Sequence, residues 1–445
     1  MKRWMIVYDT HLKACEKTVS AIMPYIDYIP VCASFPKDGF NTITLKTDTD
    51  IAGIKISVSP ANGENQSIEI IGRDETYLLY AVADFKNIYL PFARCSFTSC
   101  GPYYFKTLFS NPLKSYEYSS APKIEQRGLW LWGHTVLDFR RFIDNMVDLK
   151  LNTLILWNDF PPVNIGDVIA YAHENGVLVY LGFAWGWDTK MPDVITEDYL
   201  NGVAKAAVST YNSQYANIDC DGIYFQTFTE NMPDNVSGVS VAERAVSLVN
   251  TVGNTLLKEK PDLKILFGLH AGCALNNLDK IADVDPRISI IWEDVGAFPY
   301  HYIPTKTENF EKTLENTRRI RDLRSGGFGT VLKGVICLDW GRFEHQQGAF
   351  LLGGYDRNHI KIKADEKREI LRFIQASWIK NARYAQDIIR EYKKDSLITC
   401  LVEDGAFEEL VNFPTAVYAS LLWDSDRDIG DILYEVSLRP DVDFI

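Results

Sequence analysis

One pattern occurs eight times between Gln126 and Asp404: a short apolar run that ends on a Trp, His, Asn, Asp or Glu. In chain order the runs are GLWLWGH, NTLILWND, VLVYLGFAWGW, GIYFQTFTE, LKILFGLH, ISIIWED, GVICLDW and LITCLVED. Continuous apolar runs of this length are typical of strands buried on both faces. Amphipathic segments of helical length, such as 137–150 and 240–260, lie between the runs. Eight such strand–helix units predict an α/β fold, the (β/α)8 TIM barrel.

The pattern is weakest around the seventh run, which we place at 334–340. A Gly-rich turn at 326–329 precedes it, and we interpret that turn as the end of a helix rather than a phosphate cradle. The fifth helix, near 278–285, is also short, and a long loop at 341–359 follows the seventh run. Loops of that length are usually functional or disordered.

Residues before the barrel have a different pattern. The segments NTITLKT, GIKISVSP and QSIEIIGR alternate apolar and polar residues, as half-buried strands do, and 74–90 carries a helical apolar stripe. A polar, Pro-containing linker then begins at Ser110. We therefore expect a small N-terminal α+β domain at 1–122, the barrel at 123–425 and a C-terminal extension at 426–445.

Charge and cysteine spacing exclude several classes of protein. The net charge of −13 gives no basic face for nucleic acid or an anionic membrane. The eight Cys form no CxxC pair, no HExxH motif is present, and we expect neither a metal nor another cofactor. No apolar stretch is long enough for a signal peptide or a membrane span, so we expect a cytoplasmic protein. The sequence leaves the oligomeric state open.

Carboxylates and aromatic residues gather where the predicted strands end, and parallel barrel strands all end at one rim. Glu230, Glu293 and Asp339 follow the fourth, sixth and seventh runs, and we predict that they are catalytic. Cleavage of a glycosidic bond needs one carboxylic acid to protonate the leaving oxygen and a second carboxylate as base or nucleophile. The predicted sugar-binding residues at the same strand ends are His134, Trp157, Asn158, Asp159, Trp185, Trp187, His270, Trp292 and Trp340.

Each of these residues also has a purely structural interpretation. A carboxylate after a strand can cap the next helix, and a Trp can simply fill the core. Successive residues on a strand face opposite sides, so only some of Trp185, Trp187, Glu293 and Asp294 can face a ligand. Asp339 could instead form a structural ion pair with Arg342.

Four segments resemble a known group of enzymes: SIEIIGRDETYLLYAVADF, APKIEQRGLWLWG, LKLNTLILWNDF and FPTAVYASLLWDSDRDIGDILYEVSLRP. They are similar to glycoside hydrolases that join a small α/β domain to a (β/α)8 barrel, including the β-N-acetylhexosaminidase and α-glucuronidase families. The resemblance to α-glucuronidases implies that Glu230 is the general acid and that Glu293 and Asp339 activate water. The hexosaminidases carry an Asp-Glu pair on the fourth strand, whereas Thr229 precedes Glu230 here.

The sequence therefore predicts a glycoside hydrolase that cleaves a terminal sugar from an oligosaccharide or glycoside. The alternative is a carbohydrate-binding barrel without catalysis. A third possibility, a lyase or isomerase, would require a Lys or a metal cluster at the strand ends. Lys190 and Lys333 are the nearby lysines, and we expect neither to be well placed.

Overall fold

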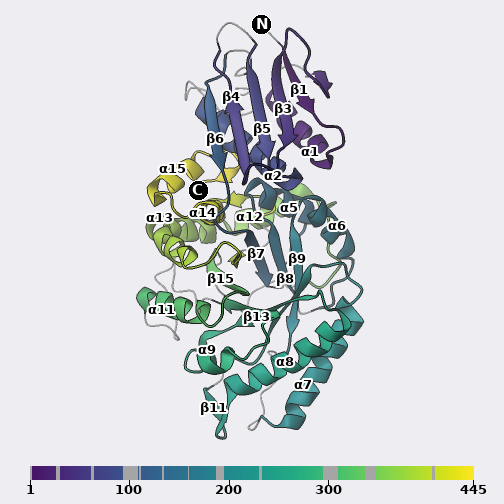
Figure 1. The fold of residues 1–445 in the computed structure, drawn as a ribbon, viewed down its shortest axis with the longest axis vertical. Helices are drawn as coiled ribbons and strands as arrows, with labels where there is room; N and C mark the ends of the chain where they lie inside the picture. Colours follow the sequence, from purple (N-terminus) through teal and green to yellow (C-terminus); the bar gives the residue numbers. More distant parts are fainter. Residues whose placement is uncertain are drawn as a thin grey trace. The chain divides into compact units, whose positions relative to one another are not determined.

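The computed structural model describes most of the chain (Figure 1). The described residues are 3–26, 31–61, 65–93, 109, 112–132, 135–158, 160–186, 195–229, 233–293, 309–335, 346–402 and 406–445. They divide into two compact units. The first comprises Met1–Pro122, Met146–Lys150 and Asp431–Asp443, and the second comprises Lys123–Asn145, Leu151–Gly430 and Phe444–Ile445.

The first unit contains a six-stranded mixed sheet with the order β2-β1-β3-β5-β4-β6. The three strands predicted from alternation are β3, β4 and β5, and their apolar residues are buried in alternation. The side chain of Asp74 accepts a hydrogen bond from the backbone of Tyr77 and so caps the helix that follows. The elements are β1 (Trp4–Tyr8), α1 (Lys13–Ile22), η1 (Met23–Tyr25), β2 (Val31–Ala33), β3 (Asn41–Thr47), β4 (Ile54–Val58), β5 (Ser67–Gly72), α2 (Glu75–Asp84), η2 (Phe85–Tyr89), α3 (Leu90–Ala93), β6 (Tyr116–Ser120), α15 (Ile429–Ser437, begun in the second unit) and β18 (Val442–Asp443).

The second unit contains a closed barrel of eight parallel strands, β7-β8-β9-β10-β13-β14-β15-β16, each paired with its neighbours and the last with the first. The predicted TIM barrel, preceded by a small domain with a mixed sheet, is confirmed (Figure 1). The strands are β7 (Gln126–Trp132), β8 (Thr153–Trp157), β9 (Leu178–Ala184), β10 (Gly222–Gln226), β13 (Lys264–Leu269), β14 (Ile288–Glu293), β15 (Phe328–Val335) and β16 (Leu397–Val402), with the short β11 (Asn235–Val236), β12 (Val239–Ser240) and β17 (Val411–Asn412) outside the barrel.

Local sequence signals set the bounds of the surrounding helices. Ser240 caps α8 through the backbone N–H of Glu243, and Asn309 caps α11 in the same way. Gly176 takes the left-handed conformation (φ 70°) just after α6, where a side chain would be strained. The helices are α5 (Phe139–Asp148), α6 (Gly166–Glu174), α7 (Glu197–Thr210), η3 (Tyr211–Tyr215), α8 (Val241–Glu259), α9 (Ala271–Ala274), α10 (Leu278–Ile281), α11 (Phe310–Arg321), α12 (Arg357–Glu366), α13 (Arg368–Arg390) and α14 (Phe413–Trp423).

The seventh barrel strand differs from the prediction. It is β15, which starts at Phe328, whereas the sequence suggested a strand at 334–340. Lys333 interrupts the apolar run, so the sequence pattern did not reveal the strand. In the structure its charged group lies inside the barrel beside Glu293. The turn that we interpreted as a helix end therefore leads directly into a strand. The register of β15 against β16 also shifts between Leu332 and Val335, next to that lysine.

The barrel interior is filled by alternate residues of each strand. Trp130, Ile155, Tyr180, Tyr224, Leu266, Ile291, Val331 and Leu397 belong to one buried cluster with contributions from all eight strands. Their neighbours two positions further along each strand face the same side. This places Gln226, Glu293 and Lys333 inside the barrel, towards the carboxyl ends of the strands. Across the described residues, no helix is long and apolar enough to cross a membrane.

Candidate active site at the carboxyl end of the barrel

Polar side chains inside the barrel surround Glu293, the last residue of β14. Oε1 of Glu293 accepts hydrogen bonds from the Tyr224 hydroxyl at 2.5 Å and from the Gln226 side-chain amide. Oε2 lies 3.0 Å from Nε2 of His270 and 3.4 Å from Nζ of Lys333. These five residues, which we call the Glu293 cluster, come from β10, β14, β15 and the residue after β13. Glu293 and His270, which the sequence placed at the ends of different strands, therefore lie side by side as predicted.

The charge of Glu293 is set by two opposing effects. Burial would raise the pKa of Glu293, because only 1% of the residue is exposed. Nearby His270 and Lys333, together with hydrogen bonds from His270 and Tyr224, outweigh burial and hold this pKa well below its usual range. Burial, reinforced by the adjacent Glu293, raises the pKa of Tyr224 well above its usual value. The cluster thus contains an ionised carboxylate and a protonated phenol.

Two glycines in the barrel interior leave space for the Glu293 cluster and for Trp157. A Cβ on Gly268 of β13 would collide with the Tyr224 hydroxyl and with Oε1 of Glu293. Gly182 of β9 has the same role beside Trp157, because a Cβ there would lie 2.8 Å from the indole ring. Both glycines lie inside the barrel, where their missing side chains leave space for larger functional groups on neighbouring strands.

Trp157 faces the barrel interior next to the cluster. Its ring packs edge-on against Tyr224, with ring centroids 6.3 Å apart, and it belongs to the interior core. Asn158 follows it and is largely buried, with its amide nitrogen donating to the carbonyl oxygen of Phe160. Within the described chain, the side-chain oxygen of Asn158 has no hydrogen-bond partner.

Trp185 and Trp292 lie elsewhere. Trp292 precedes Glu293 on β14 and so points to the opposite face of the strand, with 1% of its surface exposed. Trp185 is fully buried and stacks on Phe225, which in turn stacks on Phe267. Phe225 and Phe267 neighbour the inward-facing Tyr224 and Leu266, so this aromatic stack lies on the outer face of the strands. Neither Trp offers a ring face to a sugar in this structure.

The other predicted site residues lie outside the described residues. They are the catalytic candidates Glu230 and Asp339 and the binding candidates His134, Asp159, Trp187 and Trp340. Their roles stay predictions.

Sequence reasoning missed Lys333, Tyr224 and Gln226. The expectation that Lys333 is poorly placed was wrong, since its ammonium group is beside Glu293 and 14% of its side chain is exposed. One signal could have identified two of them: Gln226 and Lys333 each lie two residues from a side chain that faces the barrel interior, Tyr224 and Val331. A polar residue at such a position must find a partner there.

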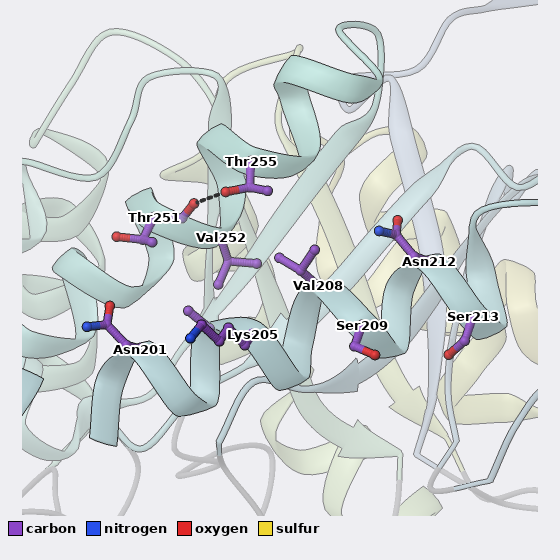
Figure 2. A pocket seen from close by; sticks show the side chains of 10 residues that line it. Asn201, Lys205, Val208, Ser209, Asn212, Ser213, Thr251, Val252 and Thr255 are labelled. Atoms are coloured by element: carbon purple, nitrogen blue, oxygen red, sulfur yellow. Dashed lines mark hydrogen bonds between the residues drawn. The ribbon is translucent and has the colours of Figure 1, made fainter. Parts of the chain in front are cut away.

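A surface groove is lined by residues other than those of the Glu293 cluster. It has a volume of about 730 Å³ and runs between α7 and α8 (Figure 2). Small and polar side chains line it, among them Asn201, Lys205, Ser209 and Thr251, over an apolar floor that includes Val208. No strand contributes to the lining, so the groove belongs to the outer helical layer. It contains none of the predicted site residues.

In the described ranges, no group of three or more His, Cys, Asp or Glu side chains could hold a metal ion. The five residues of the Glu293 cluster supply only two such side chains, Glu293 and His270. The contacts of the cluster are hydrogen bonds and ion pairs to the Glu293 carboxylate.

No family model matches the sequence, and no curated protein is recognisably similar to it. Solved structures of glycoside hydrolases do share its fold. CpGH84B matches with a TM-score of 0.54 and 12% identity, over 97% of this chain and 70% of its own. An exo-β-N-acetylglucosaminidase of family GH20 from Vibrio harveyi matches with a TM-score of 0.52 and 12% identity, over 98% and 73%. A mutant Streptomyces plicatus β-hexosaminidase gives 0.53 and 11%, over 98% and 91%.

These similarities confirm the structural resemblance to β-hexosaminidases and related barrel glycoside hydrolases. They do not specifically support the α-glucuronidases. At 11–12% identity they establish the fold and leave the reaction to be argued from the residues.

Proposed function

We propose that this protein is a glycoside hydrolase that removes a terminal sugar from an oligosaccharide or glycoside. The observation that carries the proposal is the Glu293 cluster, an ionised carboxylate with four donors at the carboxyl ends of neighbouring barrel strands. In TIM-barrel enzymes that end carries the active site. The shared fold with exo-acting glycoside hydrolases supports the same assignment.

Glu230 is the proposed general acid. It follows β10, the strand that pairs with β13 and contributes Tyr224 and Gln226 to the cluster. In hydrolysis it would give its proton to the leaving oxygen as the glycosidic bond breaks. The ring carbon that loses this bond then accepts a water oxygen or a carboxylate.

Asp339 and Glu293 are the two candidates for the second carboxylate, which activates water or attacks the sugar ring. An oxygen that already accepts several hydrogen bonds is a weak base, and both oxygens of Glu293 are engaged. We therefore assign water activation or nucleophilic attack to Asp339. Glu293 keeps its negative charge, which stabilises the positive charge that develops on the sugar ring and holds His270 and Lys333 in place. His270, Lys333 and Asn158 are the proposed hydroxyl-binding groups among the described residues.

The decisive variant is Glu230→Gln, assayed on a panel of nitrophenyl glycosides. For substrates with poor leaving groups we expect kcat/KM to fall roughly 100-fold to 10,000-fold, the usual contribution of a general acid. For a dinitrophenyl glycoside of the same sugar we expect a smaller loss, because that leaving group needs little protonation. Glu243→Gln, an exposed carboxylate in the first turn of α8, is the matched control and should leave both rates unchanged. Equal losses for both leaving groups would refute the acid role.

A carbohydrate-binding barrel without catalysis is the second candidate. The saturated hydrogen bonding of Glu293 favours it, since no described carboxylate in the barrel interior is free to act as acid or base. This candidate predicts no turnover of any glycoside, together with sugar binding by calorimetry that Glu230→Gln leaves intact.

A Schiff-base lyase is disfavoured by the same cluster. Such enzymes need an uncharged lysine amine, whereas Lys333 is ion-paired with Glu293. Borohydride treatment in the presence of an aldose or ketose should therefore leave Lys333 unmodified, as peptide mass spectrometry would show.

A further inference from the structure

The residues around Glu293 form two pairs, one on each oxygen of its carboxylate. Oε1 accepts hydrogen bonds from Tyr224 and Gln226, which we call the supporting pair. Oε2 lies beside His270 and Lys333, which we call the outer pair. The supporting pair is buried, whereas 7% of the His270 side chain and 14% of the Lys333 side chain are exposed. Of the two pairs, the outer pair is therefore the one that a ligand can reach.

Packing fixes the position of the Tyr224 hydroxyl. The ring lies edge-on to Trp130 and to Trp157, with ring centroids 5.7 and 6.3 Å away. Gly268, on the neighbouring strand β13, leaves the space that the hydroxyl occupies, because a Cβ there would collide with it. The hydroxyl therefore meets Oε1 of Glu293 from a fixed direction, at 2.5 Å.

Tyr224 is the donor in this contact. Burial and the adjacent Glu293 raise the pKa of Tyr224 well above its usual value, so the phenol keeps its proton. The carboxylate is ionised, and a hydrogen bond to an ionised acceptor is stronger than one between neutral groups. The hydroxyl therefore restrains the direction of the Glu293 carboxylate and supports its charge.

The other oxygen of the carboxylate restrains Lys333. Nζ of Lys333 lies 3.4 Å from Oε2 of Glu293. An ammonium group has three N–H donors on a flexible four-carbon chain, so one carboxylate contact fixes its direction and leaves donors for a ligand. If the carboxylate turns, the ammonium group turns with it. The contacts thus form a series from Tyr224 through Glu293 to Lys333.

We propose that Tyr224 is a positioning residue of the barrel site: its hydroxyl fixes the Glu293 carboxylate, which in turn directs the Lys333 ammonium group towards the sugar. The inference rests on the proposed function and extends it, because it makes Lys333 the group that contacts the sugar. Tyr224 is fully buried and acts only through Glu293.

A double-mutant cycle in the full-length protein tests this role. Tyr224→Phe removes only the hydroxyl, and Lys333→Met removes the ammonium group. We expect each single change to lower kcat/KM for the best nitrophenyl glycoside at least roughly tenfold. The double variant should match Lys333→Met within about twofold, because the hydroxyl has no ammonium group left to direct. Losses that multiply in the double variant would overturn the proposal.

Tyr180→Phe is the matched control. It removes one hydroxyl from another buried tyrosine of the same interior cluster. The acidic neighbour of Tyr180 is Asp221, which precedes β10 at the amino end of the barrel. This change should leave kcat/KM unaltered, with and without Lys333→Met. A loss as large as that of Tyr224→Phe would show that any disturbance of the interior lowers activity, and would overturn the specific role of Tyr224.

Gln226→Met covers the case in which Tyr224→Phe does not fold. It removes the other donor to Oε1, and its loss should likewise disappear in the Lys333→Met background. A wild type that hydrolyses no glycoside would refute the hydrolase but not the positioning role. The same cycle is then measured as the Kd of methyl glycosides by calorimetry. Losses that multiply there, or no binding of any glycoside, would overturn the positioning role as well.

Discussion

The Glu293 carboxylate contacts the other four residues of its cluster, so its replacement should lower the free energy of unfolding. Glu293→Gln leaves Lys333 without its counter-charge, and breaking a buried ion pair costs about 3–5 kcal/mol. Because the pKa of Glu293 is lowered on folding, its ionised form stabilises the protein above the ordinary value of 4.5 and loses this effect as the pH falls below it. Urea denaturation should therefore show a gap between wild type and variant that is largest at pH 7 and shrinks below pH 4.5. A gap of equal size at both pH values would contradict this account.

Residue 268 must be a glycine, because its surroundings leave no room for a side chain. Gly268→Ala places a methyl group against the Tyr224 hydroxyl and the Glu293 carboxylate, and overpacking of this kind costs about 1–3 kcal/mol. Gly202→Ala is the matched control, because a Cβ there, on α7, meets no atom within 4 Å. That change should stabilise the protein by about 0.5–1 kcal/mol. Thermal unfolding of both variants measures the difference. A neutral Gly268→Ala would mean that the barrel interior is less tightly packed than its geometry indicates.

At the scale of elements, the end of α2 depends on a buried ion pair within the first unit. Lys150 donates to Asp84, the last residue of α2, at 2.6 Å, and both residues are buried. Burial, which outweighs the attraction of Asp84, lowers the pKa of Lys150. Lys150→Met leaves Asp84 as an unpaired buried charge, and we expect a loss of about 3 kcal/mol in the free energy of unfolding. Adding Asp84→Asn should recover much of it. Additive losses in this double-mutant cycle would show that the pair is not coupled.

Elements were predictable where apolar periodicity and capping residues agree. Strands β8, β13 and β14 lie within the predicted apolar runs, and α8 begins directly after Ser240, at the start of the predicted helical segment. Strand β15 was misplaced because Lys333 breaks its run, and only the three-dimensional partner Glu293 explains a charge at that position.

At the scale of the whole molecule, the sequence predicted the order of the small domain and the barrel, because a parallel barrel leaves an unmistakable repeat of strands and helices. It could not predict which aromatic residues face inward, since Trp185 and Trp292 occur at strand ends yet pack on the outer face. A cytoplasmic location, like the division of the chain at 425, stays a prediction. Residues Asp431–Asp443 pack with the first compact unit.

We propose that the protein acts through the carboxyl end of its barrel and not through the groove between α7 and α8 (Figure 2). One pair of matched substitutions separates these places: Lys333→Met in the Glu293 cluster and Lys205→Met in the groove. The measurement is kcat/KM for the nitrophenyl glycoside that the wild type hydrolyses fastest. We predict at least a tenfold loss for Lys333→Met and no change for Lys205→Met. Full activity in Lys333→Met, or a loss confined to Lys205→Met, would contradict the account.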